Sequence, residues 1–99
     1  MSVYVSIGRN IGEEPMAAES WRRFRQETES TVERFAGPVV TAAEGKGRYD
    51  GLSEDTFIVV GAASETFGLI DALETLRRRF GQESIAIAFA NPYFIGTEE

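Results

Sequence analysis

Apolar residues recur with two different periods along this chain, and the order of those periods constrains the fold more than any other feature. Val3, Val5 and Ile7 alternate with polar neighbours, and this period of two predicts a strand with one packed face. Two later segments have the spacing of amphipathic helices, and short apolar runs separate and follow them. The resulting order is strand, helix, strand, strand, helix, strand.

The first helix is expected over about residues 17–35, because its apolar residues recur at intervals that place them on one face. That apolar stripe consists of Trp21, Phe24, Thr28, Val32 and Phe35. Charged residues of both signs lie between them and form a solvated face. Gly37-Pro38 is a strong signal for the end of the helix.

The next segments predict a second strand over Val39–Ala43 and a third over Thr56–Gly61. Between them, Gly45–Gly51 is expected to form an irregular arm or hairpin turn. In the third strand large apolar residues point to both sides, so both of its faces are expected to be buried.

The second helix is expected to begin at Ser64, an N-cap residue, with Glu65 in its first turn. Its buried stripe comprises Leu69, Ile70, Leu73, Leu76 and Phe80. Gly81 ends this helix, and Ser84–Ala90 alternates as a fourth strand. Residues 93–95, Tyr93-Phe94-Ile95, are a candidate for a short fifth strand.

This order predicts an α+β, ferredoxin-like βαββαβ fold formed by one domain over residues 1–99. Right-handed crossovers place both helices on one face of a four-stranded antiparallel sheet, in a two-layer sandwich. The other face is expected to carry few charges, so a contact should cover it: a second copy of the chain in a homodimer, the arm at 45–52, or the tail. The candidate interface residues are Tyr4, Ala86, Ala88, Ala90, Tyr93 and Phe94.

Composition excludes several classes of function. The formal charge is −6, from 16 acidic and 10 basic residues, which disfavours broad binding to nucleic acid or to an anionic membrane. Cysteine and histidine are both absent, which removes disulfides, thiolate nucleophiles, Cys/His zinc sites and an imidazole relay. No metal ligand and no cofactor is predicted. No apolar run approaches the roughly 20 residues that span a bilayer, and the start does not resemble a signal peptide, so a cytoplasmic protein is expected.

Two glycine-containing segments are candidates for ligand binding. Residues 8–12 lie between a strand and a helix, where backbone N–H groups can hold a phosphate, although Glu13 and Glu14 would repel it and a structural turn is favoured. The arm carries two cations and an aromatic residue, which suit either a ligand-gripping loop or a solvated hairpin tip. The candidate ligand contacts are Arg9, Asn10, Lys46, Arg48 and Tyr49.

No residue is predicted to be catalytic. The carboxylate pairs Glu13–Glu14 and Glu54–Asp55 fall in predicted loops. Two carboxylates that are both exposed to water are not expected to divide the roles of general acid and general base. The three arginines at 77–79 point about 100° apart on a helix, and a helix C-terminus favours cations without any ligand.

The segment Arg77-Arg78-Arg79-Phe80-Gly81-Gln82-Glu83-Ser84-Ile85 resembles the most regular part of a family of small bacterial domains of unknown function. The glycine turn at Gly8-Arg9 and the Trp21-x-x-Phe24 helix are similar to further features of that family. The chain departs from it in lacking an export or lipoprotein signal and in its shorter connections. The family has no agreed activity, so the resemblance implies the fold and no site. A short, acidic, histidine-free version is also typical of a bacteriophage protein.

Two functions of different classes remain open. The first is a non-catalytic protein-binding or assembly module, a homodimer that acts through its sheet face or edge. The second is a protein that binds a small ligand, an anion or nucleotide, or an enzyme, using a cleft under the arm at 45–52. The absence of histidine and cysteine removes the commonest acid–base and nucleophilic groups, so the sequence favours the first.

Overall fold

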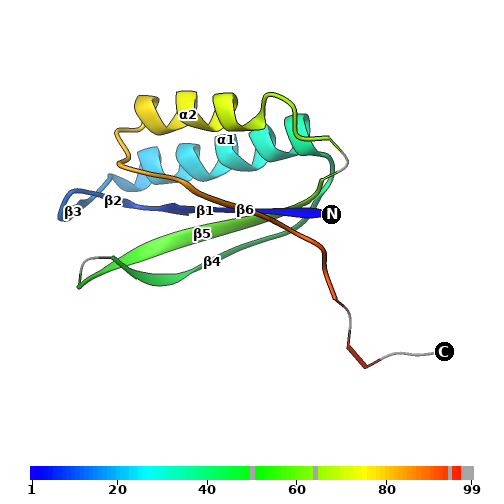
Figure 1. Ribbon diagram of the computed structural model, residues 1–99. Helices are drawn as coiled ribbons and strands as arrows, with labels where there is room; N and C mark the ends of the chain where they lie inside the picture. Colours follow the sequence, from blue (N-terminus) through cyan, green and yellow to red (C-terminus); the bar gives the residue numbers. More distant parts are fainter. Residues whose placement is uncertain (50, 64, 94, 97–99) are drawn as a thin grey trace.

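Two helices cover one face of a four-stranded antiparallel sheet, in the arrangement that the sequence predicts (Figure 1). The computed structural model describes residues 1–49, 51–63, 65–93 and 95–96. Its elements are β1 (Ser2–Gly8), β2 (Asn10–Ile11), β3 (Glu14–Pro15), α1 (Ala18–Ala36), β4 (Val39–Tyr49), β5 (Leu52–Ala62), α2 (Leu69–Arg79) and β6 (Ala86–Ala90).

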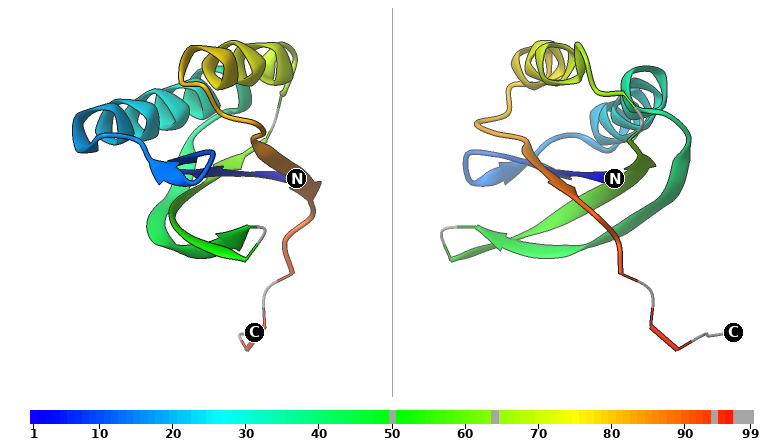
Figure 2. Two further views of the ribbon diagram at one scale, coloured as in Figure 1. Left: turned by 90° about the vertical axis from the view of Figure 1, so that its left-hand side faces the viewer. Right: turned by 45° about the vertical axis from the view of Figure 1, so that its right-hand side comes forward.

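The strand order in the main sheet is β4-β5-β1-β6, so the first and last main strands lie side by side. Every neighbouring pair is antiparallel: Val5 lies opposite Val59 of β5 on one side and Ile87 of β6 on the other. This order and the two helices on one side confirm the ferredoxin-like fold. Figure 2 shows both helices lying on the same side of the sheet, while the β4–β5 hairpin curls away from them.

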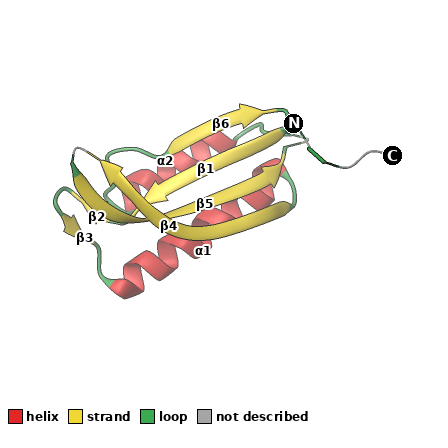
Figure 3. Ribbon diagram, turned by 90° about the horizontal axis from the view of Figure 1, so that it is seen from below, coloured by secondary structure: helices red, strands yellow, loops and turns green. Residues whose placement is uncertain are grey.

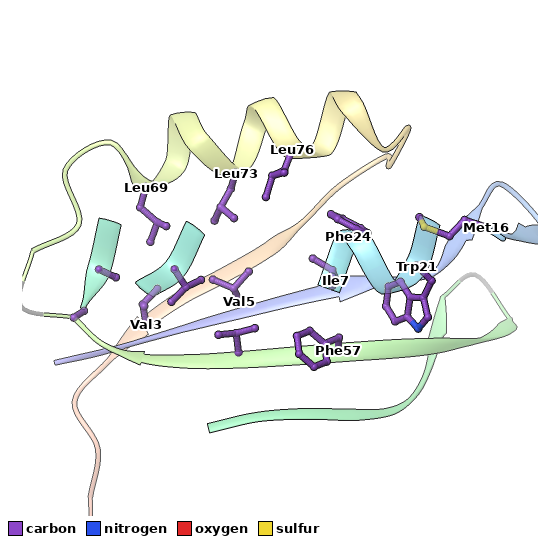
Figure 4. Packing of buried hydrophobic residues seen from close by; sticks show 14 residues of the cluster. Val3, Val5, Ile7, Met16, Trp21, Phe24, Phe57, Leu69, Leu73 and Leu76 are labelled. Atoms are coloured by element: carbon purple, nitrogen blue, oxygen red, sulfur yellow. The ribbon is translucent and has the colours of Figure 1, made fainter. Parts of the chain in front are cut away.

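The core lies between the helices and the sheet. Val3, Val5 and Ile7 are at most 1% exposed, so the predicted alternation in β1 is confirmed. The stripe of α1 and three leucines of α2 pack onto them from above (Figure 4). Phe24 stacks on Phe80 with ring centroids 4.7 Å apart, and this contact joins α1 to the end of α2. Burying each large side chain contributes about 1.5–3 kcal/mol.

The arm is the main difference from the sequence expectation. Residues 39–49 form one strand, not a short strand and an irregular arm, and β5 begins at Leu52 instead of Thr56. The register is continuous from Thr41 opposite Val60 to Tyr49 opposite Leu52. Gly47 fits because a Cβ there would lie 2.8 Å from the Thr56 methyl carbon. Cross-strand pairing therefore overrides the low strand propensity of the glycines.

Smaller corrections concern the ends of elements. The helix α2 begins at Leu69 after Gly68, whose φ of 86° suits glycine; Glu65 precedes the helix, and Ser64 lies outside the described residues. Residues 10–15 form the small β2–β3 ladder, which was not expected. The strand β6 begins two residues later than predicted.

The tail differs from its expectation as well. The fifth strand is absent from the described part of the tail: Tyr93 and Ile95 are 87% and 86% exposed, and Phe94 lies outside the described residues. Figure 1 shows the tail extending away from the body of the protein. The described residues of the tail therefore do not cover the open sheet face.

Figure 3 shows the sheet from the side away from the helices, where no helix of the described residues covers it. This face is only partly apolar. Tyr4 is half-buried between Val60 and Ala88, but Ile58 is 43% exposed, so the expectation that both faces of this strand are buried was wrong. The face also carries charge, since Glu54 shares the alternation of Ile58. No helix in the described ranges is long and apolar enough to cross a membrane.

Candidate functional site

A cleft of about 570 Å³ lies at one end of the open sheet face, where β1 leaves the sheet. This volume is within the usual range for small-molecule sites. Its floor is formed by small or polar residues of three adjacent strands, and its rims by the β2–β3 turn, the β4–β5 hairpin and the segment before β6. The lining residues are Ser6, Ile7, Gly8, Asn10, Gly12, Glu13, Gly47, Arg48, Leu52, Glu54, Thr56, Glu83, Ser84 and Ala86.

Glu54 is the most constrained carboxylate of the cleft. It is half-buried, and the backbone N–H of Asn10 donates a hydrogen bond of 2.8 Å to its Oε2. The side chain lies over Gly8, where an added Cβ would come within 2.6 Å of the carboxyl carbon and both oxygens. Gly8 therefore provides the space for the carboxylate, and Asn10 fixes its direction.

The neighbouring residue Asp55 points to the opposite side of the strand. It accepts hydrogen bonds from Lys46 Nζ (2.5 Å) and Arg9 Nη1 (3.0 Å), and these two cations lower the pKa of Asp55. The Arg9 Nε also donates to the carbonyl of Met16 at 2.8 Å. This cluster connects the end of β1 to the β4–β5 hairpin and to the segment before α1. It lies on the side of the sheet opposite the cleft and stabilises the strands that form the cleft floor.

The two rims formed by the β2–β3 turn and the segment before β6 are also connected. Gln82 is only 6% exposed, and its Nε2 donates to the carbonyl oxygen of Asn10 at 3.1 Å. The Arg77 Nη1 in turn donates to the carbonyl oxygen of Gln82 at 2.9 Å. A continuous series of hydrogen bonds thus runs from the end of α2 through Asn10 to Glu54.

The lining of the cleft is acidic. Three acidic residues, Glu13, Glu54 and Glu83, line it, against one basic residue, Arg48. Because side chains alternate along a strand, the Arg48 side chain is on the same face of the sheet as that of Lys46, opposite to the face of Gly47 and Glu54. This balance favours a cationic ligand over a phosphate. Within the described residues no group of three acidic side chains is arranged to hold a metal ion.

The structure divides the predicted ligand contacts into two groups. Asn10 and Arg48 line the cleft, whereas Arg9 and Lys46 bind Asp55 behind it; the side chain of Tyr49 lies outside what the structure describes. The carboxylate pair at 54–55 lies in a strand and not in a loop.

Sequence reasoning missed Glu54 as a cleft residue. The available signal was its place two residues before Thr56 in the alternation of the open face. Had the third strand been extended at its start, Glu54 would have fallen on that face.

The predicted interface residues are also divided. Ala86 lines the cleft, Ala88 and Ala90 are exposed beside Tyr4 on the open face, and Tyr93 lies on the extended tail. Association with a second copy remains a prediction.

The arginines at 77–79 are each engaged within the chain. Arg77 and Arg78 bind Glu74 at 2.6 and 2.9 Å and lower the pKa of Glu74 to about 2, with Arg77 as the larger cause. Arg79 pairs with Glu27 of α1. These contacts hold the end of α2 in place and account for the cations without a phosphate ligand.

Comparisons with solved structures find the same fold in a phage SAM lyase. The lyase in its apo state matches with a TM-score of 0.62 and 24% identity over 87% of this chain and 75% of that one. The lyase in complex with S-methyl-5'-thioadenosine matches with a TM-score of 0.55 and 23% identity over 87% of this chain and 76% of that one. At this identity the likeness establishes the fold. No protein-family model and no curated protein sequence matches the chain.

These comparisons correct the first functional interpretation. Both structures are of an enzyme, and one holds a nucleoside thioether. The prediction of a non-catalytic protein-binding or assembly module is therefore wrong, and the alternative, a small ligand in a cleft beside the arm, is favoured. The cleft that this alternative requires is present, with Gly47, Arg48 and Leu52 of the arm along one rim.

Proposed function

We propose that this chain binds S-adenosylmethionine in the acidic cleft and cleaves it to S-methyl-5'-thioadenosine. The observation that carries the proposal is the half-buried carboxylate of Glu54, fixed by Asn10 in a cleft whose lining includes two further acidic residues. S-adenosylmethionine has a positively charged sulfonium next to a flat nucleoside, and an acidic cleft attracts that charge. The shared fold with a phage SAM lyase supports this choice of cation.

The bond to be broken joins the sulfonium sulfur to Cγ of the amino acid. S-methyl-5'-thioadenosine departs with the electron pair of this bond, and the sulfur becomes neutral. Without water, the substrate's own carboxylate oxygen can attack Cγ and close a five-membered lactone, or a Cβ proton can be lost to leave an alkene. Ring closure needs no protein base, which suits a chain without histidine or cysteine.

The cleft contributes binding and orientation to this reaction. Attack on Cγ requires the carboxylate to approach in line with the departing sulfur, and holding the substrate folded in that geometry lowers the barrier. Because the sulfonium loses its charge in the transition state, a carboxylate close to it stabilises the bound substrate more than the transition state. Glu54 is therefore assigned to substrate binding, so its loss should raise KM without lowering kcat.

The proposal is tested by incubating the purified chain with S-adenosylmethionine and separating the products by liquid chromatography and mass spectrometry. S-methyl-5'-thioadenosine should appear in proportion to enzyme, together with an equal amount of a four-carbon product whose NMR spectrum distinguishes the lactone from the alkene. Formation at only the rate of a protein-free control would contradict the proposal. A product containing one added water would show hydrolysis instead.

We also propose that the chain pairs with a second copy through β6. This edge strand carries no charge, proline or bulge, and its Phe89 is 41% exposed, whereas the opposite edge, β4, has Lys46, Arg48 and a bulge. Light scattering should give a mass above that of the monomer, reduced to the monomer by Ala88→Lys. A monomeric mass across micromolar concentrations would contradict the pairing.

The substrate's presence inside cells supports a cytoplasmic location, and the phage source of the structural neighbours supports a phage-encoded chain. The resemblance to a family of small bacterial domains remains a proposal alongside these.

A further inference from the structure

We propose that Gln82 is a positioning residue, which fixes the carboxylate of Glu54 through the backbone of Asn10 and thereby sets the preference of the cleft for a positively charged ligand. This inference rests on the proposed binding of an adenosyl cation. Gln82 does not line the cleft and lies in the turn between α2 and β6.

The first observation is the burial of a polar side chain at this turn. Gln82 is 6% exposed. Burying a side-chain amide destabilises the folded state unless its donors and acceptors form hydrogen bonds. Its Nε2 donates to the carbonyl oxygen of Asn10 at 3.1 Å, across 72 residues of sequence. The side chain therefore connects two segments that no strand pairing joins directly.

The second observation is that the residue which Gln82 contacts, Asn10, also contacts Glu54. Asn10 accepts from Gln82 with its carbonyl oxygen and donates to Glu54 Oε2 with its N–H, at 2.8 Å. The position of this residue thus determines where the carboxylate lies. The β2–β3 turn is also held by its two-residue ladder, by the hydrogen bonds between Arg9 and Met16, and by Asn10 Nδ2, which donates to the carbonyl oxygen of Ser53 at 3.4 Å. The Gln82 contact adds a tie from the end of α2 to the carbonyl oxygen of Asn10.

The third observation is that Gln82 itself is held from the other side. Its backbone N–H donates to the carbonyl oxygen of Arg77 at 3.0 Å, and its carbonyl oxygen accepts from Arg77 Nη1 at 2.9 Å. Arg77 is in turn paired with Glu74. The donor that reaches Asn10 is therefore anchored to a helix, and helices position groups more accurately than loops do.

The test is Gln82→Met, which keeps a side chain of similar length but removes the amide donor. The probes are sinefungin, which has an amine in place of the methylsulfonium and carries a positive charge there, and S-adenosylhomocysteine, which is neutral at sulfur. Calorimetric titration of both gives the preference for charge as a ratio of affinities. A general loss of structure would weaken both ligands alike and leave this ratio unchanged.

We expect Gln82→Met to lower the sinefungin preference about fivefold and Glu54→Gln to lower it about tenfold, with the double variant no lower than Glu54→Gln alone, because residues in one network are not additive. Val32→Ala, in the core at the opposite end of the sheet, is the matched control for lost stability and should keep the wild-type ratio.

An unchanged ratio in Gln82→Met, or additive losses in the double variant, would overturn this inference while leaving the proposed function intact. If the wild-type chain bound neither probe, or bound both equally, the proposed function would fail and this inference with it.

Discussion

Replacing Glu54 with glutamine is the perturbation that bears most closely on the charge of the cleft. The substitution keeps the size of the side chain and an oxygen that can accept from the Asn10 N–H, but removes the negative charge. The nearby space over Gly8 accommodates the amide as well as the carboxylate. A change in ligand binding can therefore be assigned to charge, and the free energy of unfolding should change by less than about 1 kcal/mol.

The expected size follows from Coulomb's law. A ligand cation about 6 Å from the Glu54 carboxylate, in a half-buried cleft with an effective dielectric constant of about 40, gains about 1.4 kcal/mol from that charge. This corresponds to about tenfold in affinity. Glu54→Gln should weaken sinefungin about tenfold at low ionic strength and S-adenosylhomocysteine by less than about twofold. Added salt should reduce the difference between the two ligands in the wild type, because the cleft is open to solvent.

Calorimetric titration of both ligands against both proteins provides the measurement, with Asp55→Asn as the control. Asp55 adjoins Glu54 in sequence but lies behind the cleft, bound to Lys46 and Arg9. Equal weakening of the charged and the neutral ligand by Glu54→Gln would refute the electrostatic argument. An Asp55→Asn effect as large as that of Glu54→Gln would show that overall charge, and not the position of Glu54, determines the preference.

Three further substitutions test other parts of the structure. Gly8→Ala should displace the Glu54 carboxylate and lower the preference for sinefungin as Glu54→Gln does, with less than about 1 kcal/mol lost in urea unfolding because a flexible side-chain end can move aside; an unchanged preference would contradict the close approach. Thr28→Val should raise the free energy of unfolding by about 1 kcal/mol, since the buried Thr28 hydroxyl has no hydrogen-bond partner among the described residues, and a loss of stability would argue against this. The lowered pKa of Glu74, about 2 against an ordinary 4.5, stabilises the fold above about pH 4.5, and this contribution is lost as pH falls toward 2. Unfolding followed across that range should therefore be less pH-dependent in Glu74→Gln, and an identical pH dependence in both proteins would refute the pairing.

The order of the elements could be predicted from the sequence because each core face has its own period. The alternation of β1 and most of each helix stripe are buried as predicted, but Ile70 was wrongly placed in the stripe of α2, since it is 60% exposed, and Phe35 and Phe80 are only partly buried. The extent of the β4–β5 hairpin could not be predicted, because its glycines and charged residues have low strand propensity and only pairing with the partner strand orders them. The start of α2 depends on Gly68 in a left-handed conformation, which the sequence pattern alone did not indicate.

The site was less accessible to sequence reasoning than the fold. The arm and Asn10 were predicted as ligand contacts. Glu54, the most constrained carboxylate of the cleft, was instead predicted to lie in a solvated loop. Its partners are distant in sequence: Asn10 lies 44 residues away, and Gln82 contacts Asn10 across 72 residues. The Glu54 carboxylate becomes constrained only when three strands and two turns come together in the fold. A local sequence pattern cannot predict such long-range contacts.

The location of the ligand is the central claim, and NMR titration tests it most directly. A ¹⁵N-labelled sample is titrated with sinefungin, and the amide shifts are mapped onto the structure. The largest shifts should fall on Ser6, Gly8, Asn10, Glu54 and Thr56, on the open face of the sheet and its rim. Shifts confined to the groove between α2 and β6, lined by Ile70, Leu73 and Ile87, or no saturable shifts at all, would contradict the assignment of the acidic cleft as the binding site.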